Sequence, residues 1–466
     1  MIIMKTSFKN IVSCLLAGCM ALPVAAQELR TSYFMQTSNF RHQMNPALLD
    51  KPYIGTLLSN VNVGTTGNVG LANFIYKLEG NPRYDLTTFM SPTVSASEFL
   101  GDLNDKNRID VYLNYNLFSV GFNMLKGVSL LEVNLRSNTN LCLPKELFEF
   151  AKCAGAKEHY QLQDIGLRSS NYLELAFGHA RNINDKLRVG AKFKVLLGGA
   201  YSDLTAEKLD LTMNGDKWII EGNAQLKASV LKSDVTVDYD KKPSADGRYR
   251  VDELDNVSFG IPGKGFAVDF GATYQFNEDW TFSAAVTDLG FMNWKDTHHA
   301  SSQGLYEFDG FDHPIYAGGT NTGKNEIGDQ FDQMGKDLED MFSLYYDGKK
   351  SSSNALATTI NLGAEYTFPL YRKLRFGALY TSRINGKYSW HQGMISANVR
   401  PLNFIEVAVN TACSSTGITF GGVLSLNAKH FNFYLGADRF LGKTSKEFIP
   451  LHSANANINL GMTFPL

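Results

Sequence analysis

The sequence has few cysteines, few charged residues and no excess of either charge. Only five of its 466 residues are Cys. Charged residues make up 19%, below the roughly 25% of ordinary soluble domains. Lys and Arg total 44, Asp and Glu total 46, and the net charge is −2. This balance excludes the basic footprint of a nucleic-acid-binding protein and an acidic solvating tail.

The cysteines are too few to hold the fold together through disulfides. Cys14 and Cys19 lie close to the N-terminus, which leaves Cys142, Cys153 and Cys413 for the rest of the chain. Cys142 and Cys153 are near enough in sequence to bridge across a loop, and free thiols are the alternative. No CxxC, HExxH or paired Cys/His spacing occurs, so we expect no metal site and no other cofactor.

Mean hydropathy is also low, at −0.17, which argues against a bundle of transmembrane helices. Aromatic residues nevertheless reach 12%, too many for a disordered chain. Two classes combine these properties. One is a large soluble β-protein, and the other is a membrane β-barrel in which apolar and polar residues alternate.

The first 26 residues have the pattern of a secretory signal peptide. Lys5 and Lys9 supply a positive start, an apolar run follows, and small residues precede a cleavage point between Ala26 and Gln27. The run is too short for a membrane-spanning helix. The sequence therefore predicts export and removal of residues 1–26.

One alternative lies inside this signal. Residues 16–19 read Leu-Ala-Gly-Cys, the form of a site at which Cys19 would be lipidated and become the mature N-terminus. Residues 20–26 stay apolar, whereas a lipoprotein normally turns polar after its cysteine. The pattern favours ordinary cleavage after Ala26.

The C-terminus shows the clearest two-residue period. From 454 to 466 every even position is apolar, including Ile458 and Phe464, while odd positions include Asn457 and Asn459. Side chains on a strand alternate between faces, so one face is apolar and the other polar. In a soluble sandwich the apolar face would be the core. In a membrane barrel it would contact lipid, and the asparagines would line the lumen.

Similar alternation predicts about fourteen strands, give or take two. We place them at 54–76, 109–124, 129–143, 170–181, 187–199, 263–276, 280–290, 354–368, 373–383, 388–399, 403–411, 417–427, 430–440 and 454–466. Several of these runs exceed the 5–6 residues usual in soluble strands and match the ~9–11 residues of a tilted membrane-spanning strand. The first two assignments are the longest, and each can hide a bulge or an extra hairpin.

Connections between these strands alternate in length. One end has short turns, whereas the other has the long loops 77–108, 144–169, 200–262 and 291–353. Outer-membrane barrels sort their loops in this way, with short periplasmic turns and long extracellular loops. The sequence therefore predicts an all-β fold, a transmembrane antiparallel β-barrel over 54–466 with an N-terminal plug at 27–53.

Two of the long loops have structure of their own. Residues 327–345 have the apolar spacing of an amphipathic helix, which we expect to fold over the barrel mouth. Residues 201–258 carry short alternating runs, which predict hairpins that continue above the membrane or fold inward.

A search for catalytic residues finds none. His179 and Ser170 share a predicted strand, but no Gly-x-Ser-x-Gly motif supports a nucleophile. His298 and His299 lie in a long loop, where adjacent histidines diverge, so solvated polarity is favoured over a metal site. We predict that the protein is not an enzyme.

Charged and aromatic side chains on the predicted strands suit a barrel. Charges on the polar faces either form a satisfied ion-pair network, which we favour, or tune the passage of a solute. They are Glu132, Arg136, Arg188, Lys192 and Lys194. Trp280, Trp294 and Trp390 fit aromatic girdles at the membrane interfaces.

Four strand motifs stand out. They are Gly-Phe-Ala-Val-Asp-Phe-Gly-Ala-Thr-Tyr at 265–274 and Thr-Asp-Leu-Gly-Phe-Met-Asn-Trp-Lys at 287–295, together with the strands at 172–178 and 190–198. These motifs resemble an uncharacterised family of Bacteroidota outer-membrane barrels, a domain of unknown function. The resemblance covers most of the mature chain and implies a barrel in the outer membrane.

A wider similarity is to FadL-like long-chain fatty-acid transporters and to barrels of the type IX secretion system. Those families carry an Asn-Pro-Ala element in an N-terminal segment that plugs the lumen. Here Asn45, Pro46 and Ala47 stand at a matching place before the first strand. Asn-Pro is also an ordinary turn starter. No pocket residues of the transporters can be matched.

Two functions follow as hypotheses, both with the outer-membrane bilayer as the surroundings. The first is a passive conduit for a small apolar solute that enters between the extracellular loops and leaves around the plug. The second is a structural or assembly role in an outer-membrane or secretion complex, with a protein partner at the loops. A soluble secreted β-protein or a barrel enzyme is the third alternative, and nucleic acid is not expected as a partner.

Overall fold

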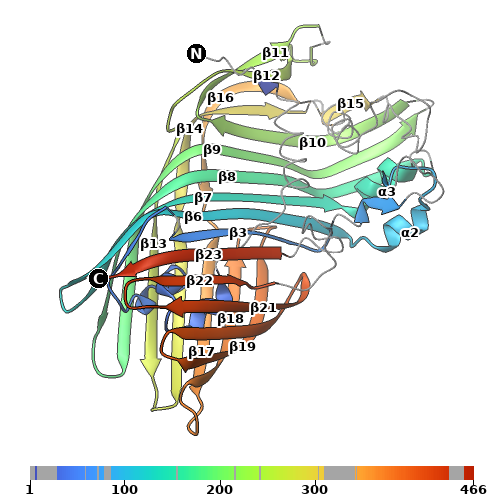
Figure 1. Cartoon of the computed structure of the whole chain (residues 1–466). Helices are drawn as coiled ribbons and strands as arrows, with labels where there is room; N and C mark the ends of the chain where they lie inside the picture. The colour runs from blue at the N-terminus through green and yellow to red at the C-terminus, as the bar shows by residue number, and fades with distance from the viewer. Residues whose placement is uncertain are drawn as a thin grey trace.

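The computed structural model describes residues 6–7, 29–57, 59–70, 73–77, 86–153, 156–214, 217–240, 243–302, 304–308, 342, 344–439 and 456–466. Most of these residues are in β-strands. Fourteen of the strands pair antiparallel, each with the next, and the last pairs with the first (Figure 1). The predicted barrel and its strand number are confirmed.

The barrel strands follow each other around the wall in chain order. They are β2 (Tyr53–Gly55) with β3 (Asn60–Gly67), β6 (Lys106–Met124), β7 (Gly127–Pro144), β8 (His159–Asn182), β9 (Leu187–Asn214), β13 (Gly263–Gln275), β14 (Trp280–Ser301), β17 (Thr358–Thr367), β18 (Leu374–Ile384), β19 (Trp390–Leu402), β20 (Ile405–Ser414), β21 (Gly417–Asn427), β22 (Asn432–Ala437) and β23 (Ala456–Pro465). Leu460 of β23 pairs with Val61 of β3, which closes the ring.

The predicted first strand, 54–76, is not continuous. It divides into β2 and β3, and the chain then leaves the barrel. After Gly67 comes a stretch with Asn68 and Gly70, residues that favour turns over strands. The short β4 (Ile75–Lys77) then pairs with β5 (Leu86–Thr88) in a separate sheet.

The sheet continues past the barrel at the end where long loops were expected. β8 and β9 run well beyond the predicted 170–181 and 187–199, so the loops 144–169 and 200–262 are shorter than predicted. The hairpins predicted over 201–258 are present. The extension is completed by β10 (Lys217–Val230), β11 (Lys232–Asp238), β12 (Arg250–Ser258), β15 (Gly304–Phe308) and β16 (Tyr345–Ala355), and β1 (Thr6–Ser7) pairs with β12.

The helix predicted at 327–345 lies almost wholly outside the described residues. Of that range only 342, 344 and 345 are described, and Tyr345 begins β16. β16 pairs with the upper part of β14, which continues to Ser301. The loop predicted at 291–353 therefore starts and ends in strand. The predicted cleavage residues Ala26 and Gln27 are also outside the described residues.

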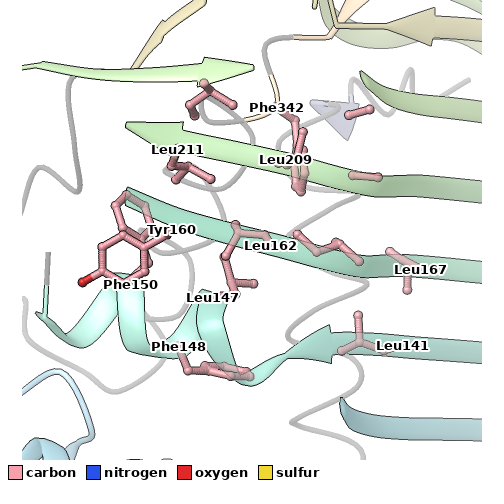
Figure 2. Packing of buried hydrophobic residues seen from close by; sticks show 14 of the residues in the cluster. Leu141, Leu147, Phe148, Phe150, Tyr160, Leu162, Leu167, Leu209, Leu211 and Phe342 are labelled. Carbon is pink, nitrogen blue, oxygen red and sulfur yellow. The ribbon is translucent and has the colours of Figure 1, made fainter. Parts of the chain in front are cut away.

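Two α-helices cover one face of the extension. α2 (Ala96–Gly101) and α3 (Lys145–Cys153) lie at one end of β6 to β9 in Figure 1. In Figure 2, Phe150 of α3 packs against Tyr160 of β8, with ring centroids 5.3 Å apart, and Leu147 lies near Leu162. The helix is amphipathic because its apolar residues recur on one side, so it buries that side on the sheet.

The two faces of the barrel wall have opposite polarity. Ile458 and Phe464 of β23 are 45% and 39% exposed, whereas Asn459 between them is 0% exposed. A soluble sandwich would bury those apolar residues instead. The exposed apolar face runs around the barrel, with Phe193, Phe270, Phe282, Leu362, Phe376, Ile395, Val409, Phe420 and Leu435. A lipid-facing surface explains this pattern.

Two tryptophans do not occupy the predicted girdles. Trp280 is 39% exposed at the short-turn end and fits the prediction, but Trp294 and Trp390 are buried. Trp294 stacks on Tyr201 at 5.1 Å, and the guanidinium of Arg30 lies 4.4 Å above Trp390. The strand was predicted to end at residue 290, but β14 continues past a bulge beside Asp288, and after this bulge Met292 and Trp294 lie on the inward face.

Two further observations concern the cysteine bridge and the possibility of membrane-spanning helices. Cys142 and Cys153 are free thiols, so the bridge weighed above is not formed. Within the described part of the chain, no helix has both the length and the apolar character needed to cross a membrane.

Candidate functional site

Residues 29–52, here called the N-terminal segment, lie inside the barrel. The segment forms three short 3-10 helices, drawn in blue among the barrel strands in Figure 1: η1 (Arg30–Phe34), η2 (Asn39–Gln43) and η3 (Pro46–Leu48). Most of its side chains are buried. Apolar side chains of the segment, including Phe34, Phe40 and Met44, pack against the barrel wall, and hydrogen bonds to the wall hold its backbone.

Two carboxylates on the wall hold backbone N–H groups of this segment. Asp438 accepts from the N–H of Arg30 at 2.9 Å and of Thr31 at 2.8 Å. Glu406 of β20 accepts from the N–H of Gln36 at 3.1 Å and of Thr37 at 2.8 Å. Hydrogen bonds to ionised acceptors are strong. Here they satisfy backbone N–H groups that would be paired within a strand or a long helix.

The Asn-Pro-Ala element sits over two glycines of the wall. Gly190 of β9 and Gly271 of β13 are direct cross-strand partners. A Cβ on Gly190 would lie 2.5 Å from the Pro46 carbonyl oxygen, and a Cβ on Gly271 would overlap the Asn45 side chain. The absence of side chains at this pair creates the recess into which residues 45 and 46 fit.

Asn45 also organises the turn itself. Its side-chain oxygen accepts from the N–H of Ala47 at 3.0 Å and so caps η3, with Pro46 at the first helical position. Its side-chain amide donates to the Tyr33 hydroxyl at 3.1 Å. Arg188 donates to the carbonyl oxygens of Ala47, at 2.9 Å, and Leu49. One predicted lumen charge therefore binds this element directly.

A first buried ion pair joins the wall to the segment. Lys192 of β9 lies 2.7 Å from Glu132 of β7 and donates to Nδ1 of His42 at 2.8 Å. His42 in turn lies 2.8 Å from the Tyr53 hydroxyl through Nε2. All four side chains are buried.

A second cluster surrounds Lys194. Its ammonium lies 2.7 Å from Asp269, 2.6 Å from Asp288 and 3.8 Å from Glu174, and Arg136 lies 3.4 Å from Glu174. The network predicted from Glu132, Arg136, Lys192 and Lys194 is thus present. Sequence reasoning missed three of its acidic members, Glu174, Asp269 and Asp288, although the first two alternate with apolar neighbours and could have been found by period alone. Nothing in the sequence distinguishes His42.

A polar cavity of about 80 Å³ lies on the long-loop side of the segment, and we call it the upper cavity. Arginines, asparagines, aromatic rings, aliphatic side chains and one carboxylate are among the groups that line it: Arg30, Arg136, Arg168, Arg383, Asn114, Asn138, Asn140, Asn354, Asn361, Asn385, Tyr112, Tyr172, Trp390, Met44, Leu113, Leu356 and Asp288. Arg383 contacts Thr359 and Asn138 at 3.4 and 3.3 Å, and no carboxylate among the described residues pairs with it. The cavity therefore offers several hydrogen-bond donors to a solute.

A second cavity, of about 300 Å³, lies on the short-turn side of the same segment, and we call it the lower cavity. It is lined by Tyr33, Phe34, Gln36, Arg41, Leu48, Asp50 and Lys51 of the segment and by Thr273, Thr281, Ser283, Glu365 and Arg375 of the wall. The segment thus stands between two polar spaces within the barrel.

The apolar cluster of Figure 2 is separate from these cavities. Leu167 belongs to that cluster and its neighbour Arg168 lines the upper cavity. Consecutive side chains on a strand point to opposite faces, so α2 and α3 pack on the face of β8 that is turned away from the cavity.

His179, which was considered for catalysis, lies where a structural role fits better than a catalytic one. Ser170 lines the upper cavity, while His179 pairs with Ser129 of β7, whose hydroxyl is 2.9 Å from Nδ1. Ser129 is fully buried, and the described residues give His179 no carboxylate to orient it as a base. This geometry lacks the accessible nucleophile and the third group of a catalytic triad.

His298 and His299 do not converge. His298 contacts the Tyr346 hydroxyl at 3.0 Å and the Ser233 carbonyl oxygen at 3.2 Å, and His299 contacts Ser352 at 3.0 Å. Burial lowers the pKa of His298, which favours its neutral form. In the part of the chain that is described, no three His, Cys, Asp or Glu side chains form a group suited to a metal.

Several solved barrels are similar to this chain at low identity. The toluene transporter TbuX of Ralstonia pickettii is 11% identical, with 96% of each chain covered and a TM-score of 0.41. The toluene transporter TodX of Pseudomonas putida is 9% identical, with 97% and 96% covered and a TM-score of 0.39. A FadL homologue of Pseudomonas aeruginosa is 9% identical, with 90% of each chain covered and a TM-score of 0.36.

Likeness at this level carries no argument about solutes, and the strand pairings alone establish the barrel. No curated protein matches the sequence significantly. The pattern of one sequence family does match, over residues 46–438, which is most of the chain. The chain belongs to this family, DUF5723, a family of unknown function.

Proposed function

We propose that this protein is a passive conduit of the outer membrane, closed by its N-terminal segment. The observation that carries the proposal is the arrangement inside the barrel. Two cavities, of about 80 and 300 Å³, lie on opposite sides of one segment that hydrogen bonds and apolar packing hold against the wall. None of these contacts belongs to the strand pairing of the barrel, so the segment can be displaced while the barrel stays folded.

The segment is accordingly the plug of this conduit, and Asn45, Pro46 and Ala47 are its fixed point on the wall. The glycine pair Gly190 and Gly271 supports this assignment, because a larger residue at either position would clash with the Asn-Pro-Ala element. The same chain begins with a signal-peptide pattern at residues 1–26, which supports export to the outer membrane.

The solute predicted from sequence is small and apolar, and TodX and TbuX are toluene transporters. The side chains that line the upper cavity add a requirement on the chemistry of the solute. Tyr112, Tyr172 and Trp390 offer apolar surface, and Arg383 offers a charged donor, whereas Arg168 is paired with Asp203 at 3.0 Å. We propose a small solute with an apolar body and a polar or anionic group.

Two uptake measurements test the conduit. Reconstituted liposomes should swell in isosmotic arabinose faster with a variant lacking residues 27–50 than with the intact protein, because the deletion joins the two cavities. Host cells that express the intact protein should take up the apolar dye 1-N-phenylnaphthylamine faster than cells without it.

The control for both measurements is Gly393→Ala. A Cβ at Gly393 has no atom within 4 Å, so this variant should behave as the unmodified protein. Equal swelling with and without the deletion, together with equal dye uptake with and without the protein, would refute the conduit. Swelling without dye uptake would restrict the solute to polar molecules.

A structural or assembly role is a second candidate. The extension formed by β10 to β12, β15 and β16 carries exposed apolar side chains, including Tyr239 at 74% and Leu305 at 61% exposure, which are typical of a protein-binding surface. A stoichiometric protein that co-purifies in detergent without crosslinker would support this role. The Bacteroidota origin and the relation to type IX secretion implied by the resemblance stay predictions.

A further inference from the structure

The two cavities line up along one side of the barrel. On β17, Asn361 lines the upper cavity and Glu365 the lower one. On β18, the corresponding residues are Arg383 above and Arg375 below. Because alternate residues of a strand share a face, these side chains belong to two continuous inward-facing rows. A path between the cavities therefore exists along β17 and β18 if nothing fills the space between them.

The wall between the cavities is unusually smooth. The inward-facing positions there are Gly363 of β17 and Gly377 and Leu379 of β18. Gly363 pairs with Leu379, and Gly377 pairs with Glu365. Because two of these three residues are glycines, the inner face of the wall has a shallow slot at this point. Polar side chains stand at both ends of the slot.

Two aromatic rings of the segment fill this slot. A Cβ on Gly363 would lie 2.5 Å from the Ser283 hydroxyl oxygen, 3.0 Å from Cε1 of Tyr33 and 3.4 Å from Cζ of Phe34, and a Cβ on Gly377 would overlap the Phe34 ring. The two rings meet edge to face with centroids 4.9 Å apart. Tyr33 and Phe34 are 1% and 4% exposed, so they close the slot completely.

The rings are held differently from each other. The Tyr33 hydroxyl lies 3.0 Å from the Ser283 hydroxyl on the wall and accepts from Asn45 at 3.1 Å. Phe34 has only packing contacts, in a cluster with Met44, Leu379 and Met394. Phe34 can therefore swing away without breaking a hydrogen bond, whereas Tyr33 moves with the Asn45 turn.

We propose that Tyr33 and Phe34 form the gate of the conduit and that the solute passes along β17 and β18 over Gly363 and Gly377. The proposal rests on the conduit function and places the route at one side of the segment. Charged and apolar side chains line both cavities, and the two rings pack with Met44 and Leu379 between them, so this route suits the solute with an apolar body and a polar group proposed above.

Conductance of single proteins in planar bilayers with potassium chloride tests the gate. Phe34→Ala and Tyr33→Ala should each raise the open fraction or the conductance several-fold over the unmodified protein. The matched control is Phe40→Ala. Phe40 is a buried aromatic residue of the same segment that packs against Tyr53 and Tyr434 and lines neither cavity, so its removal should loosen the segment but raise conductance much less than removal of Tyr33 or Phe34.

Folding is checked by the heat-dependent shift of the barrel in gel electrophoresis. If Phe34→Ala fails this check, Phe34→Leu replaces it, because Leu keeps apolar volume but cannot cover both glycines. The deletion of residues 27–50 separates the two hypotheses. If the deletion does not conduct, the conduit itself is wrong. If it conducts while both ring variants behave as Phe40→Ala does, the conduit stands and the gate at Tyr33 and Phe34 is refuted.

Discussion

Individual charged residues in the lumen owe their low exposure to partners from other strands. Lys194 is 1% exposed and touches carboxylates from β8, β13 and β14. An isolated buried ammonium would cost many kcal/mol, and the three carboxylates offset that cost. The sequence predicted that such charges would be satisfied, because they fall on polar strand faces. It could not name the partners, which are 20 to 94 residues away.

Replacing Lys194 with Met should destabilise the barrel by about 3–5 kcal/mol, because Asp269, Asp288 and Glu174 would remain buried without their cation. The measurement is urea unfolding of protein refolded into lipid vesicles. Lys106→Met is the control. Lys106 and its partner Asp164 are exposed, so that change should cost no more than about 1 kcal/mol.

A double variant makes this prediction sharper. Lys194→Met combined with Asp269→Asn removes one of the uncompensated charges, so part of the lost stability should return. A single variant as stable as Lys106→Met would show that the cluster does not hold these strands together.

The sequence allowed the strands to be located more accurately than the helices. All fourteen barrel strands were predicted, because each spans enough residues for the two-residue period to show. The upper parts of β8 and β9 were missed, since the left-handed backbone of Asp164 and a bulge at Asn171 break the period. α3 was missed because its nine residues are too few for a helical period to stand out.

The docking of η3 on the wall makes a prediction at the level of elements. Gly190→Ala places a methyl group against the backbone of Pro46 and Ala47, which cannot yield as a flexible side chain would. The overpacking should cost about 1–3 kcal/mol and loosen the segment, while the barrel remains folded.

Limited proteolysis of the segment and bilayer conductance measure this effect. Both should increase for Gly190→Ala and for Gly271→Ala, and neither should change for Gly393→Ala, whose methyl group meets no atom within 4 Å. Unchanged proteolysis in the first two variants would mean that the Asn-Pro-Ala element is not the point at which the segment is fixed.

The whole molecule is an apolar belt around a polar interior, which reverses the arrangement of a soluble protein. Low charge and modest hydropathy follow from averaging these two faces. The exposure of Ile395 at 61%, in the middle of β19, is ordinary for lipid contact and unfavourable in water.

Substitution of Ile395 by arginine distinguishes contact with lipid from contact with water. Ile395→Arg should cost about 2–4 kcal/mol in lipid vesicles, as charged residues do near the bilayer midplane. Leu305→Arg is the matched control, since Leu305 is also 61% exposed but lies on β15, outside the belt, and its change should stay within about 0.5 kcal/mol. Equal stability of the two variants would contradict a membrane position for the belt.

The sequence by itself determined the class of fold, the strand number to within two, and the face of each regular strand, because alternation is a local property of the sequence. It also marked Asn45, Pro46 and Ala47 as a turn before the first strand. Only the tertiary structure decided what that turn meets. Closure of the barrel brings Gly190, Gly271, Gly363 and Gly377 under the N-terminal segment and separates two polar cavities. Such juxtapositions depend on strands far apart in the chain, and no local pattern encodes them.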